Sequence, residues 1–493
     1  MSNSSPEILP IRTRMGYGAA EMGIFAVEMM VRLHLMKFYT DVAGLSAGLA
    51  GMAIAVAMFW DAFTDPVMGI LSDRTTMRMG KRRPYLLLGS FVMALAFLAT
   101  FRPPMLDTES GRFIFLLISY IILNTAMTVL AVPHSALGGE LSFDSNVRTS
   151  VFAFRLFFGN MGLLAGTILP IVFLDTIAPA MGTGDTPGVR DPEAATQAYF
   201  YGAAVIAGLI LLTGWVSYMA TAGRDRPAEK RPPLRGKAIL NEIGRLFQVL
   251  RNPIFVVLLG AYFIAYVGVS INSTLALYYY EYRLRLDSGS VGIILVVFII
   301  VWSASLVFWT WLSRKAGKKY PGFAGVFLLG LATCITYPFF PPGEILYPLI
   351  MSVLGGFLVG AIVLLDSLVA DIVDYDELKT GEHREGLYFG FWKMAIKASR
   401  GVSMAFTGTL LAAIGFQANQ IQTEEVSNRI AVLFGPGVGA FFLLGAIIFL
   451  FLPYSRAIHH RVQNLLVRKR ELRNRLRSGS AHFQSSVQTG GTV

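Results

Sequence analysis

The chain has 493 residues, of which 54% are hydrophobic and only 15% are charged, and its formal net charge is +11. A soluble globular domain carries about 25% charged residues, so this composition excludes one and predicts a protein that crosses a membrane several times. The single cysteine, Cys334, excludes an internal disulfide and a cysteine-based metal cluster.

Twelve apolar segments recur along the chain, and each is long enough to cross about 30 Å of hydrocarbon as a helix. They occupy residues 15–40, 46–72, 84–103, 112–137, 149–174, 197–220, 253–280, 290–312, 322–341, 345–369, 387–415 and 430–453. Residues 1–14 are polar and lead directly into the first segment, so a cleavable signal is not expected. The predicted fold class is an all-α polytopic membrane protein with twelve transmembrane helices.

Positive charge is concentrated in alternate connections between these segments. The basic connections hold Arg74, Arg78, Lys81, Arg82 and Arg83; Arg224, Lys230, Arg231, Arg235 and Lys237; and Arg314, Lys315, Lys318 and Lys319. The intervening connections hold mixed or acidic charge, such as Asp107 with Glu109. Because lysine and arginine are retained on the cytoplasmic side, this alternation predicts a multi-pass protein of the cell membrane with both termini cytoplasmic. The surplus positive charge then reflects topology, and no nucleic-acid partner is expected.

The longest polar segment inside the chain, residues 221–252, separates two parts with six apolar segments each, 15–220 and 253–455. A cytoplasmic N-terminus (1–14) and a basic tail (456–493) flank them, and the tail has the pattern of a helix lying on the anionic inner leaflet. Two six-helix halves joined by a cytoplasmic linker resemble the major facilitator superfamily, in which the substrate site lies between the halves near the midplane.

The second segment contains W-D-A-F-T-D-P, which places Asp61 and Asp65 one helical turn apart on the same face. An ionised carboxylate at bilayer depth costs roughly 2.5–3.5 kcal/mol, and two on one face repel each other. The economical explanation is a bound cation or shared protons. Pro66 also removes one helical hydrogen bond and leaves a carbonyl near Ala62 free to ligate. The alternative is a helix that ends at Pro66 with a solvated Asp61, although the apolar run continues to Leu71.

The connection after the second segment reads G-I-L-S-D-R-T-T-M-R-M-G-K-R-R-P, from Gly69 to Pro84. It resembles the G-x-x-x-D-R…G-[KR]-R loop of the major facilitator superfamily, and a shorter basic connection follows the eighth segment. Asp73 and Arg74 can pair across the cytoplasmic ends of helices and hold one conformation. A generic basic loop would explain the arginines and lysines but not the glycines or Asp73.

Charged residues also lie inside the first segment. Glu28 and Arg32 are four residues apart and oriented for an ion pair, with His34 close by. Charged side chains at this depth face the bundle interior or a watery cavity. We therefore expect Glu28, Arg32 and, from the fifth segment, Arg155 to line the substrate cavity. The alternative is a structural ion pair that satisfies itself.

Two more charges are embedded in apolar sequence. Lys397 sits in M-A-I-K-A-S-R-G, beside small residues that let helices approach closely. A lone intramembrane ammonium needs a carboxylate partner unless it snorkels to the interface. Asp366, in V-L-L-D-S-L, either joins the substrate site or pairs with Lys397.

Charged residues follow the fourth and the tenth segments at corresponding places in the two halves, and we expect them to act as gates. They are Glu140, Asp144 and Arg148 in the first half, and Asp371, Asp374, Asp376 and Arg384 in the second. They could cross-link the cytoplasmic face when the cavity opens outward. Ordinary solvated loop charge is the alternative.

Four segments together resemble the glycoside–pentoside–hexuronide:cation symporter family, the group that includes melibiose permease. They are F-Y-T-D-V-A-G-L-S (Phe38–Ser46), W-D-A-F-T-D-P (Trp60–Pro66), V-P-H-S-A-L-G-G-E-L (Val132–Leu141) and A-D-I-V-D-Y-D-E-L-K-T-G-E-H-R-E-G (Ala370–Gly386). The resemblance implies a cation site of Asp61 and Asp65 with Thr128 as a further oxygen ligand and Lys397 as a basic partner. Thr128 could instead bond back to its own helix.

The sugar-reading residues of the melibiose type are mostly replaced in this sequence. The matching acid of the fourth helix is Ala131, and the aromatic that follows it is Ser135. The acid of the first helix falls on Gly23 or Phe25, and an aromatic of the tenth helix is Ile362. Arg155 does match a sugar-site arginine. The coupling residues therefore match while a galactoside of the melibiose type is not expected.

These observations predict a secondary active transporter, and not an enzyme, that carries a small solute with Na⁺, Li⁺ or H⁺ by alternating access. No G-x-x-x-x-G-K-[ST] motif indicates ATP use, and no cofactor is expected. The expected partners are the solute, the cation and membrane lipids, with no obligatory protein partner. The family resemblance implies a glycoside, pentoside or uronate, and an anionic sugar would suit Arg32 and Arg155. The alternatives are a lysophospholipid symporter, whose W-D-A-x-T-D-P segment looks alike, and a non-transporting sensor.

Overall fold

The computed structural model describes residues 9–142, 145–178, 189–225, 244–382, 384–454, 456–459, 461–466 and 468, and within these ranges it contains helices and no β-strand. The centre of the predicted linker, Asp144 and most of the predicted tail lie outside the described residues.

The helices fall into two groups along the chain. The first group is α1 (Ile11–Met30), α2 (Ala47–Arg74), α3 (Arg83–Thr100), α4 (Glu109–Glu140), α5 (Ser145–Ile177) and α6 (Pro192–Ala220). The second is α8 (Pro253–Tyr278), α9 (Ser288–Ala316), α10 (Lys319–Thr336), α11 (Leu346–Val359), α12 (Val363–Thr380), α13 (Glu385–Ala413), α14 (Glu424–Val432) and α15 (Val438–Leu450). Short π or 3₁₀ turns continue α1 to residue 42 and α8 to residue 283, and join α11 to α12 and α14 to α15.

Ten helical segments in the described ranges are long and apolar enough to cross a membrane. This confirms the predicted class of all-α polytopic membrane protein, because only backbone that satisfies its own hydrogen bonds can span a bilayer. Residues 11–42 and Glu385–Ala413 are helical at two further predicted segments, but they carry several charged residues that lower their hydropathy. The count of twelve transmembrane helices stays a prediction.

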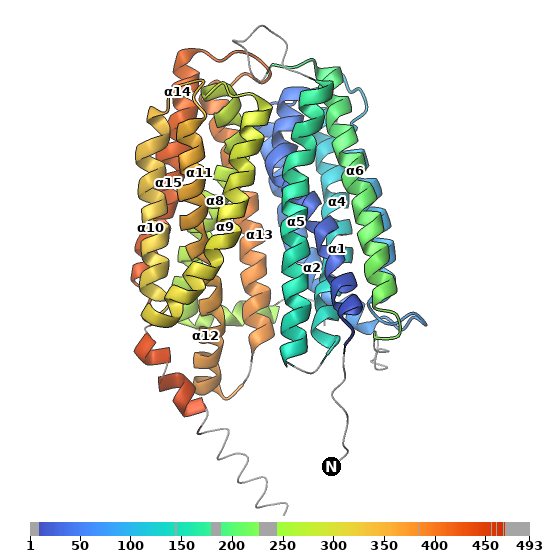
Figure 1. Cartoon of the computed structure of the whole chain (residues 1–493), viewed down its shortest axis with the longest axis vertical. Coiled ribbons are helices and arrows are strands. Elements are labelled where there is room, and N and C mark those ends of the chain that lie inside the picture. Colours follow the sequence, from blue (N-terminus) through green and yellow to red (C-terminus); the bar gives the residue numbers. More distant parts are fainter. Residues whose placement is uncertain are drawn as a thin grey trace, which may run out of the picture.

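The two groups form two bundles that stand side by side (Figure 1). In the first, α1 packs on α5 and α6 while α3 packs on α4 and α6; in the second, α8 packs on α13 and α15 while α9 packs on α11. The bundles meet where α2 packs on α13 and α5 packs on α9. Gly51 and Gly408 allow the first of these crossings, since a Cβ on Gly408 would stand 2.4 Å from the Ala47 carbonyl oxygen.

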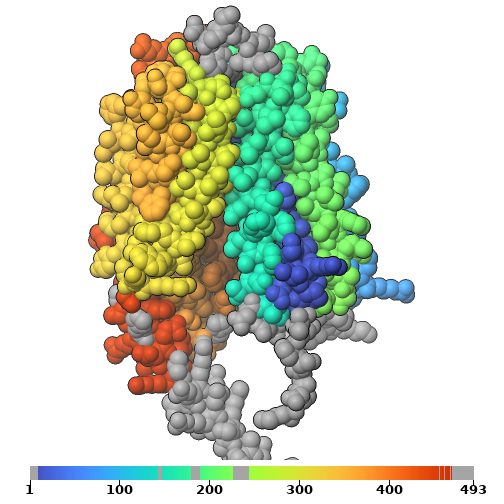
Figure 2. Space-filling view, viewed as in Figure 1, coloured from blue at the N-terminus to red at the C-terminus, as the bar shows by residue number. Residues whose placement is uncertain are grey.

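The bundles are in contact at one end and apart at the other. We call the end that holds residues 75–82, 221–225 and 381–382 the lower end, and the end that holds residues 43–46 and 284–287 the upper end, as they lie in Figure 1. Figure 2 shows the two halves pressed together toward the upper end, with a recess between them lower down. The positive-inside pattern predicts that the lower end faces the cytoplasm.

The halves repeat the same turn at the upper end. The π turn Phe38–Val42 ends with a hydrogen bond from Ala43 N to Phe38 O, and the π turn Tyr279–Arg283 ends with one from Leu284 N to Tyr279 O. Each is followed by a residue with positive φ, 68° at Gly44 and 54° at Arg285. The two turns therefore hold equivalent positions in the two halves.

The structure corrects one expectation at the lower end. Asp371, Asp374 and Asp376 do not lie in a loop, because the helix predicted over 345–369 continues as α12 to Thr380. It ends at Gly381, whose φ of 79° places it in the left-handed region that glycine adopts at helix ends. Ion pairs of Asp371 and Asp376 compensate the acidic charge of this last stretch.

Candidate functional site

A cavity lies between the two bundles, in two connected parts of about 550 and 620 Å³. Each part has the size of a small-molecule site. Six charged residues line both parts, which makes them the junction between the two: Glu28, Arg32, Asp65, Lys393, Lys397 and Arg400. The first part adds polar groups such as Asn124 and Ser135, and the second is mainly apolar and aromatic.

Asp61 and Asp65 lie side by side at the crossing of α2, α4 and α13. Lys397 Nζ is 2.7 Å from Asp61 Oδ2 and 2.6 Å from Asp65 Oδ2. On the other side, Thr128 Oγ1 is 2.7 Å from Asp61 Oδ1 and 2.8 Å from Asp65 Oδ1. Lys397 thus reaches the carboxylates rather than the membrane interface, and Thr128 bonds across helices rather than back to α4.

The cluster of Asp61, Asp65, Lys397 and Thr128 has too few positive charges and hydrogen-bond donors for its two carboxylates. A hydroxyl has one proton, so Thr128 donates to only one of the two carboxylates at a time. Two ionised carboxylates and one ammonium leave one net negative charge on groups whose side chains are 14–24% exposed. A small cation or a proton between the two aspartates would remove that charge.

The predicted pair of Glu28 and Arg32 forms, and a third residue joins it. Glu28 Oε1 is 2.8 Å from Arg32 Nη2 and 2.6 Å from Arg400 Nη2. Arg400 also donates a hydrogen bond of 3.0 Å to Tyr266. Because Glu28 is on α1 and Arg400 on α13, the pair is a bridge between the two halves rather than a self-contained structural pair.

Arg155 also faces the first part of the cavity. Its Nη2 atom is 2.7 Å from Glu21 Oε1, and its Nη1 atom donates a hydrogen bond of 3.0 Å to Ser135. Glu21 is buried and lies 3.2 Å from His134. Arg155 therefore compensates a buried carboxylate of α1 as well as lining the cavity.

The structure distinguishes the two alternatives for Asp366 and corrects one expectation about His34. Asp366 does not pair with Lys397; it accepts a hydrogen bond of 2.8 Å from Trp392 Nε1 and lines the second part of the cavity. His34 does not lie near the cavity residues. It is buried against Tyr199, 3.4 Å from that hydroxyl, because the helix turns it away from Glu28.

The predicted gating residues at the lower end form pairs within each half. Asp73 pairs with Arg82 at 2.5 Å and not with its neighbour Arg74, because adjacent residues point in different directions from a helix. Other contacts among the described residues are Glu140 with Lys81 at 2.9 Å and Arg82 at 3.1 Å, Asp371 with Lys318 at 2.8 Å, Arg384 with Asp376 at 2.7 Å, and Asp374 with Gln463 at 2.7 Å. Arg148 is exposed on α5.

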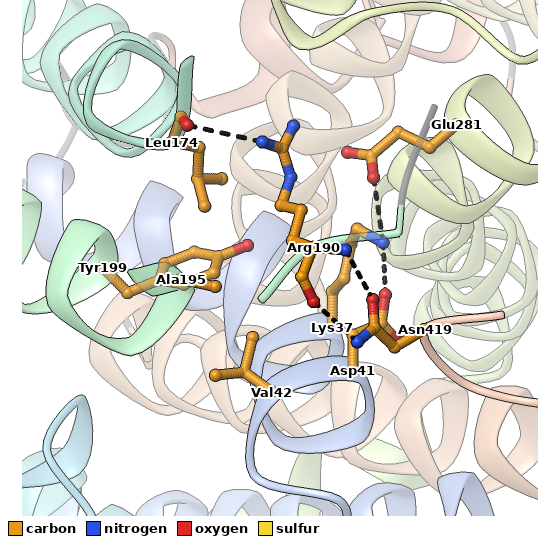
Figure 3. Close-up of a pocket in the computed structure, with 9 residues that line it drawn as sticks. All are labelled: Lys37, Asp41, Val42, Leu174, Arg190, Ala195, Tyr199, Glu281 and Asn419. Carbon is orange, nitrogen blue, oxygen red and sulfur yellow. Dashed lines mark hydrogen bonds and ion pairs between the residues drawn. The ribbon is translucent and has the colours of Figure 1, made fainter. Parts of the chain in front are cut away.

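A buried charge cluster closes the upper end, and we did not predict it from the sequence. The Lys37 ammonium lies 2.5 Å from Asp41 and 3.1 Å from Glu281. Figure 3 shows it between these two carboxylates, with Arg190 and Asn419 beside it. Tyr282 donates to Asp41 at 2.5 Å. Lys37, Asp41 and Arg190 come from the first half, and Glu281, Tyr282 and Asn419 come from the second, so the cluster ties the halves together.

The cavity residues that the sequence analysis missed are Lys393 and Arg400. With Lys397 they repeat every three or four residues on α13, which is the signal that could have found them.

Comparison with known proteins gives matches along almost the whole chain. Residues 16–456 match the family model described as MFS/sugar transport protein. The isoprimeverose transporter of Lactiplantibacillus pentosus is 27% identical, with 90% of this chain and 89% of the relative covered. A putative glycoside/cation symporter, YagG, of Escherichia coli K12 is 27% identical (86% and 88% covered), and a glucuronide carrier protein homolog of the same strain is 25% identical (90% and 93% covered).

Solved structures of transporters are similar in fold. A point mutant of the nucleoside transporter NupG aligns with a TM-score of 0.62 at 10% identity, over 90% of this chain and 100% of that one.

Proposed function

This chain belongs to the MFS/sugar transport protein family, as a glycoside–pentoside–hexuronide:cation symporter, and from that premise we propose that it moves a sugar-like solute with a cation bound between Asp61 and Asp65. It is a transporter of the cell membrane and not an enzyme. The observation that carries the proposal is the pair of carboxylates held 2.6–2.7 Å from one lysine, with a net negative charge that a cation would remove.

The cation takes the oxygens of Asp61, Asp65 and Thr128 as ligands. Carboxylate and hydroxyl oxygens suit a small hard cation, and the same pair can share a proton. Lys397 holds the empty site together and is released when the cation arrives, because both compete for the same oxygens. The cation is Na⁺, Li⁺ or H⁺.

The solute binds beside this site. Glu28, Arg32 and Arg155 offer charged donors and acceptors from the first half, and Asp366 offers an acceptor from the second. Glu28 links the solute site to the cation site, because its partner Arg400 is on α13, the helix that also carries Lys397. A movement of α13 caused by binding at one site then changes the affinity of the other site, as coupled transport requires.

The two ends of the molecule act as alternate gates. The cluster of Lys37, Asp41, Glu281 and Tyr282 closes the upper end in this conformation. When the upper end opens, we propose that the acidic and basic residues of the lower end re-pair across the halves. Those residues are Asp73, Arg74, Glu140, Arg148, Asp371, Asp374 and Arg384.

A lysophospholipid or another amphiphile is the second candidate solute. The observation that favours it is the second part of the cavity, where Phe298, Trp302, Met351 and Phe442 could receive an alkyl chain. A zwitterionic headgroup would then meet Glu28 and Arg32.

Gradient-driven uptake tests the proposed function. Protein in proteoliposomes should accumulate labelled sugars or uronates under an imposed Na⁺, Li⁺ or H⁺ gradient, and the accumulation should collapse when an ionophore removes the gradient. Uptake that equilibrates without responding to any gradient would contradict symport. Accumulation of lysolipids in place of sugars would favour the second candidate.

A further inference from the structure

Among the described residues that line the cavity, Lys393 is the cationic side chain that makes no direct ion pair. It lies on α13, one turn before Lys397, and lines both parts of the cavity with its side chain exposed there. Arg32, Arg155, Lys397 and Arg400 each have a carboxylate partner. Within the described part of the chain, no ion pair or hydrogen bond engages Lys393.

The surroundings of Lys393 leave it free for a ligand. Its charged neighbours are Arg155, Lys397, Asp65 and Glu21, and those two acids are already bonded to those two cations. Arg155, Lys393 and Lys397 thus line the same part of the cavity, and of these three only Lys393 makes no ion pair or hydrogen bond with a described residue. An unpaired ammonium in a partly desolvated cavity is unfavourable unless water or an anion compensates it.

The charge balance of the cavity explains when an anion would be needed. Five cationic side chains line the described cavity: Arg32, Arg155, Lys393, Lys397 and Arg400. Four carboxylates line it, and Glu21 behind Arg155 makes five: Glu21, Glu28, Asp61, Asp65 and Asp366. With all groups ionised, the empty cavity is neutral, and a bound cation at Asp61 and Asp65 makes it positive by one charge.

We infer that Lys393 binds an acidic group of the solute, and that the transported solute is a sugar bearing one carboxylate or sulfonate. This rests on the proposed function. The cation displaces Lys397 from the aspartates, and the anion restores neutrality at Lys393, one turn away. Each ion therefore raises the affinity of the cavity for the other.

Matched pairs of sugars test the inference. The probes are the methyl glycosides of glucuronic and galacturonic acid, compared with methyl glucoside and methyl galactoside, in counterflow and in cation-stimulated binding. Wild-type protein should favour the acid of each pair. In Lys393→Met the ratio of acid to neutral uptake should fall by roughly 10- to 100-fold, the equivalent of one charge-assisted hydrogen bond. Lys393→Arg should keep the preference, and Lys379→Met, which removes an exposed lysine at the lower end, should behave as wild type.

The possible results distinguish a failure of the proposed role of Lys393 from a failure of the proposed symport function. Coupled uptake of the neutral sugars without preference for the acids would overturn the role of Lys393 and leave symport standing. A preference for acids that survives in Lys393→Met would also overturn it. If no sugar of either kind responds to any cation, the proposed function fails and the inference fails with it. Cation-induced thermal stabilisation of Lys393→Met shows that the variant is folded and that its cation site is intact.

Discussion

Tyr282 donates a hydrogen bond to Asp41, the residue that holds the equivalent position 241 residues earlier in the other half. The two halves therefore close the upper end of the molecule with the same turn from each side. One side supplies an acid and the other a phenol, and Lys37 and Glu281 complete the contact. A closure made of few buried polar contacts can be weakened one contact at a time.

Tyr282→Phe should shift the protein toward conformations that are open at the upper end. It removes a hydrogen bond to a buried carboxylate, worth about 1.5–3 kcal/mol, which is roughly a 10- to 100-fold change in the equilibrium. Labelling of a single cysteine at Ser273, in a Cys334→Ser background, by a reagent added from the upper side measures this opening. Tyr347→Phe, on an exposed tyrosine, is the matched control. Equal labelling of all three proteins would remove Tyr282 from the gate.

Asp61→Asn and Asp65→Asn should each abolish cation-stimulated uptake. Each leaves one carboxylate for Lys397, so the net negative charge that attracts the cation disappears. Uptake under an imposed gradient measures the loss, and Asp107→Asn, on an exposed aspartate, should retain wild-type coupling. Normal coupling in both cavity variants would defeat the proposed cation site.

Lys397→Met should make folding depend on the cation. The change leaves two neighbouring carboxylates without their ammonium, so stability without cation should fall. The loss should stay below the roughly 3–5 kcal/mol of a fully buried broken pair, because the cavity admits water. Adding Na⁺ or lowering the pH should restore more stability in the variant than in wild type, as thermal unfolding in detergent would measure. An equal response of the two proteins would show that Lys397 and the cation do not compete.

Arg155→Lys should weaken solute binding by about tenfold while leaving cation binding in place. A lysine can still compensate Glu21, but it cannot bond Glu21 and Ser135 together as the guanidinium does. Solute-induced and cation-induced thermal shifts, measured separately, distinguish the two effects. Arg155→Ala would also leave Glu21 unpaired, so a poorly folded alanine variant says nothing against the lysine result. Loss of cation binding with intact solute binding would remove Arg155 from the solute site.

Gly408→Ala should destabilise the protein by about 1–3 kcal/mol, because its Cβ would press on the backbone of α2 at the crossing between the halves. Gly260→Ala on α8 is the matched control, since a Cβ there meets nothing within 4 Å. In that helix interior the alanine should be neutral or slightly stabilising. Thermal unfolding of the two variants should differ in sign or clearly in size, and similar values would mean that α2 and α13 can move apart at little cost.

Residue spacing along the chain correctly predicted the contacts that form within a single helix. The spacing of Asp61 and Asp65 placed both on one face, and the spacing of Glu28 and Arg32 predicted their ion pair; the structure has both. Residue spacing alone could not identify a partner on another helix; Lys397 and Thr128 were expected only because of the family resemblance. Arg400 completes Glu28 from the opposite half, which no spacing along α1 reveals.

The same reasoning explains the missed closure at the upper end. Lys37 and Asp41 are four residues apart and readable as a pair, but Glu281 and Tyr282 reach them only through the packing of the halves. The helical extent of α12 was hidden for a different reason. Its last turns are acidic, and such a sequence is typical of a solvated loop. In the structure Lys318 and Arg384 neutralise two of these acids, so the segment can remain helical.

The equal numbers of positive and negative side chains around the cavity determine whether the membrane voltage contributes to the driving force for uptake. A carrier whose empty cavity is neutral can reorient without moving charge through the membrane voltage, which acts with about 2.3 kcal/mol per elementary charge per 100 mV. If a monovalent cation and a singly acidic sugar fill it together, the loaded step is electrically silent as well. Uptake would then draw on the concentration gradient of the cation alone and continue in a depolarised cell.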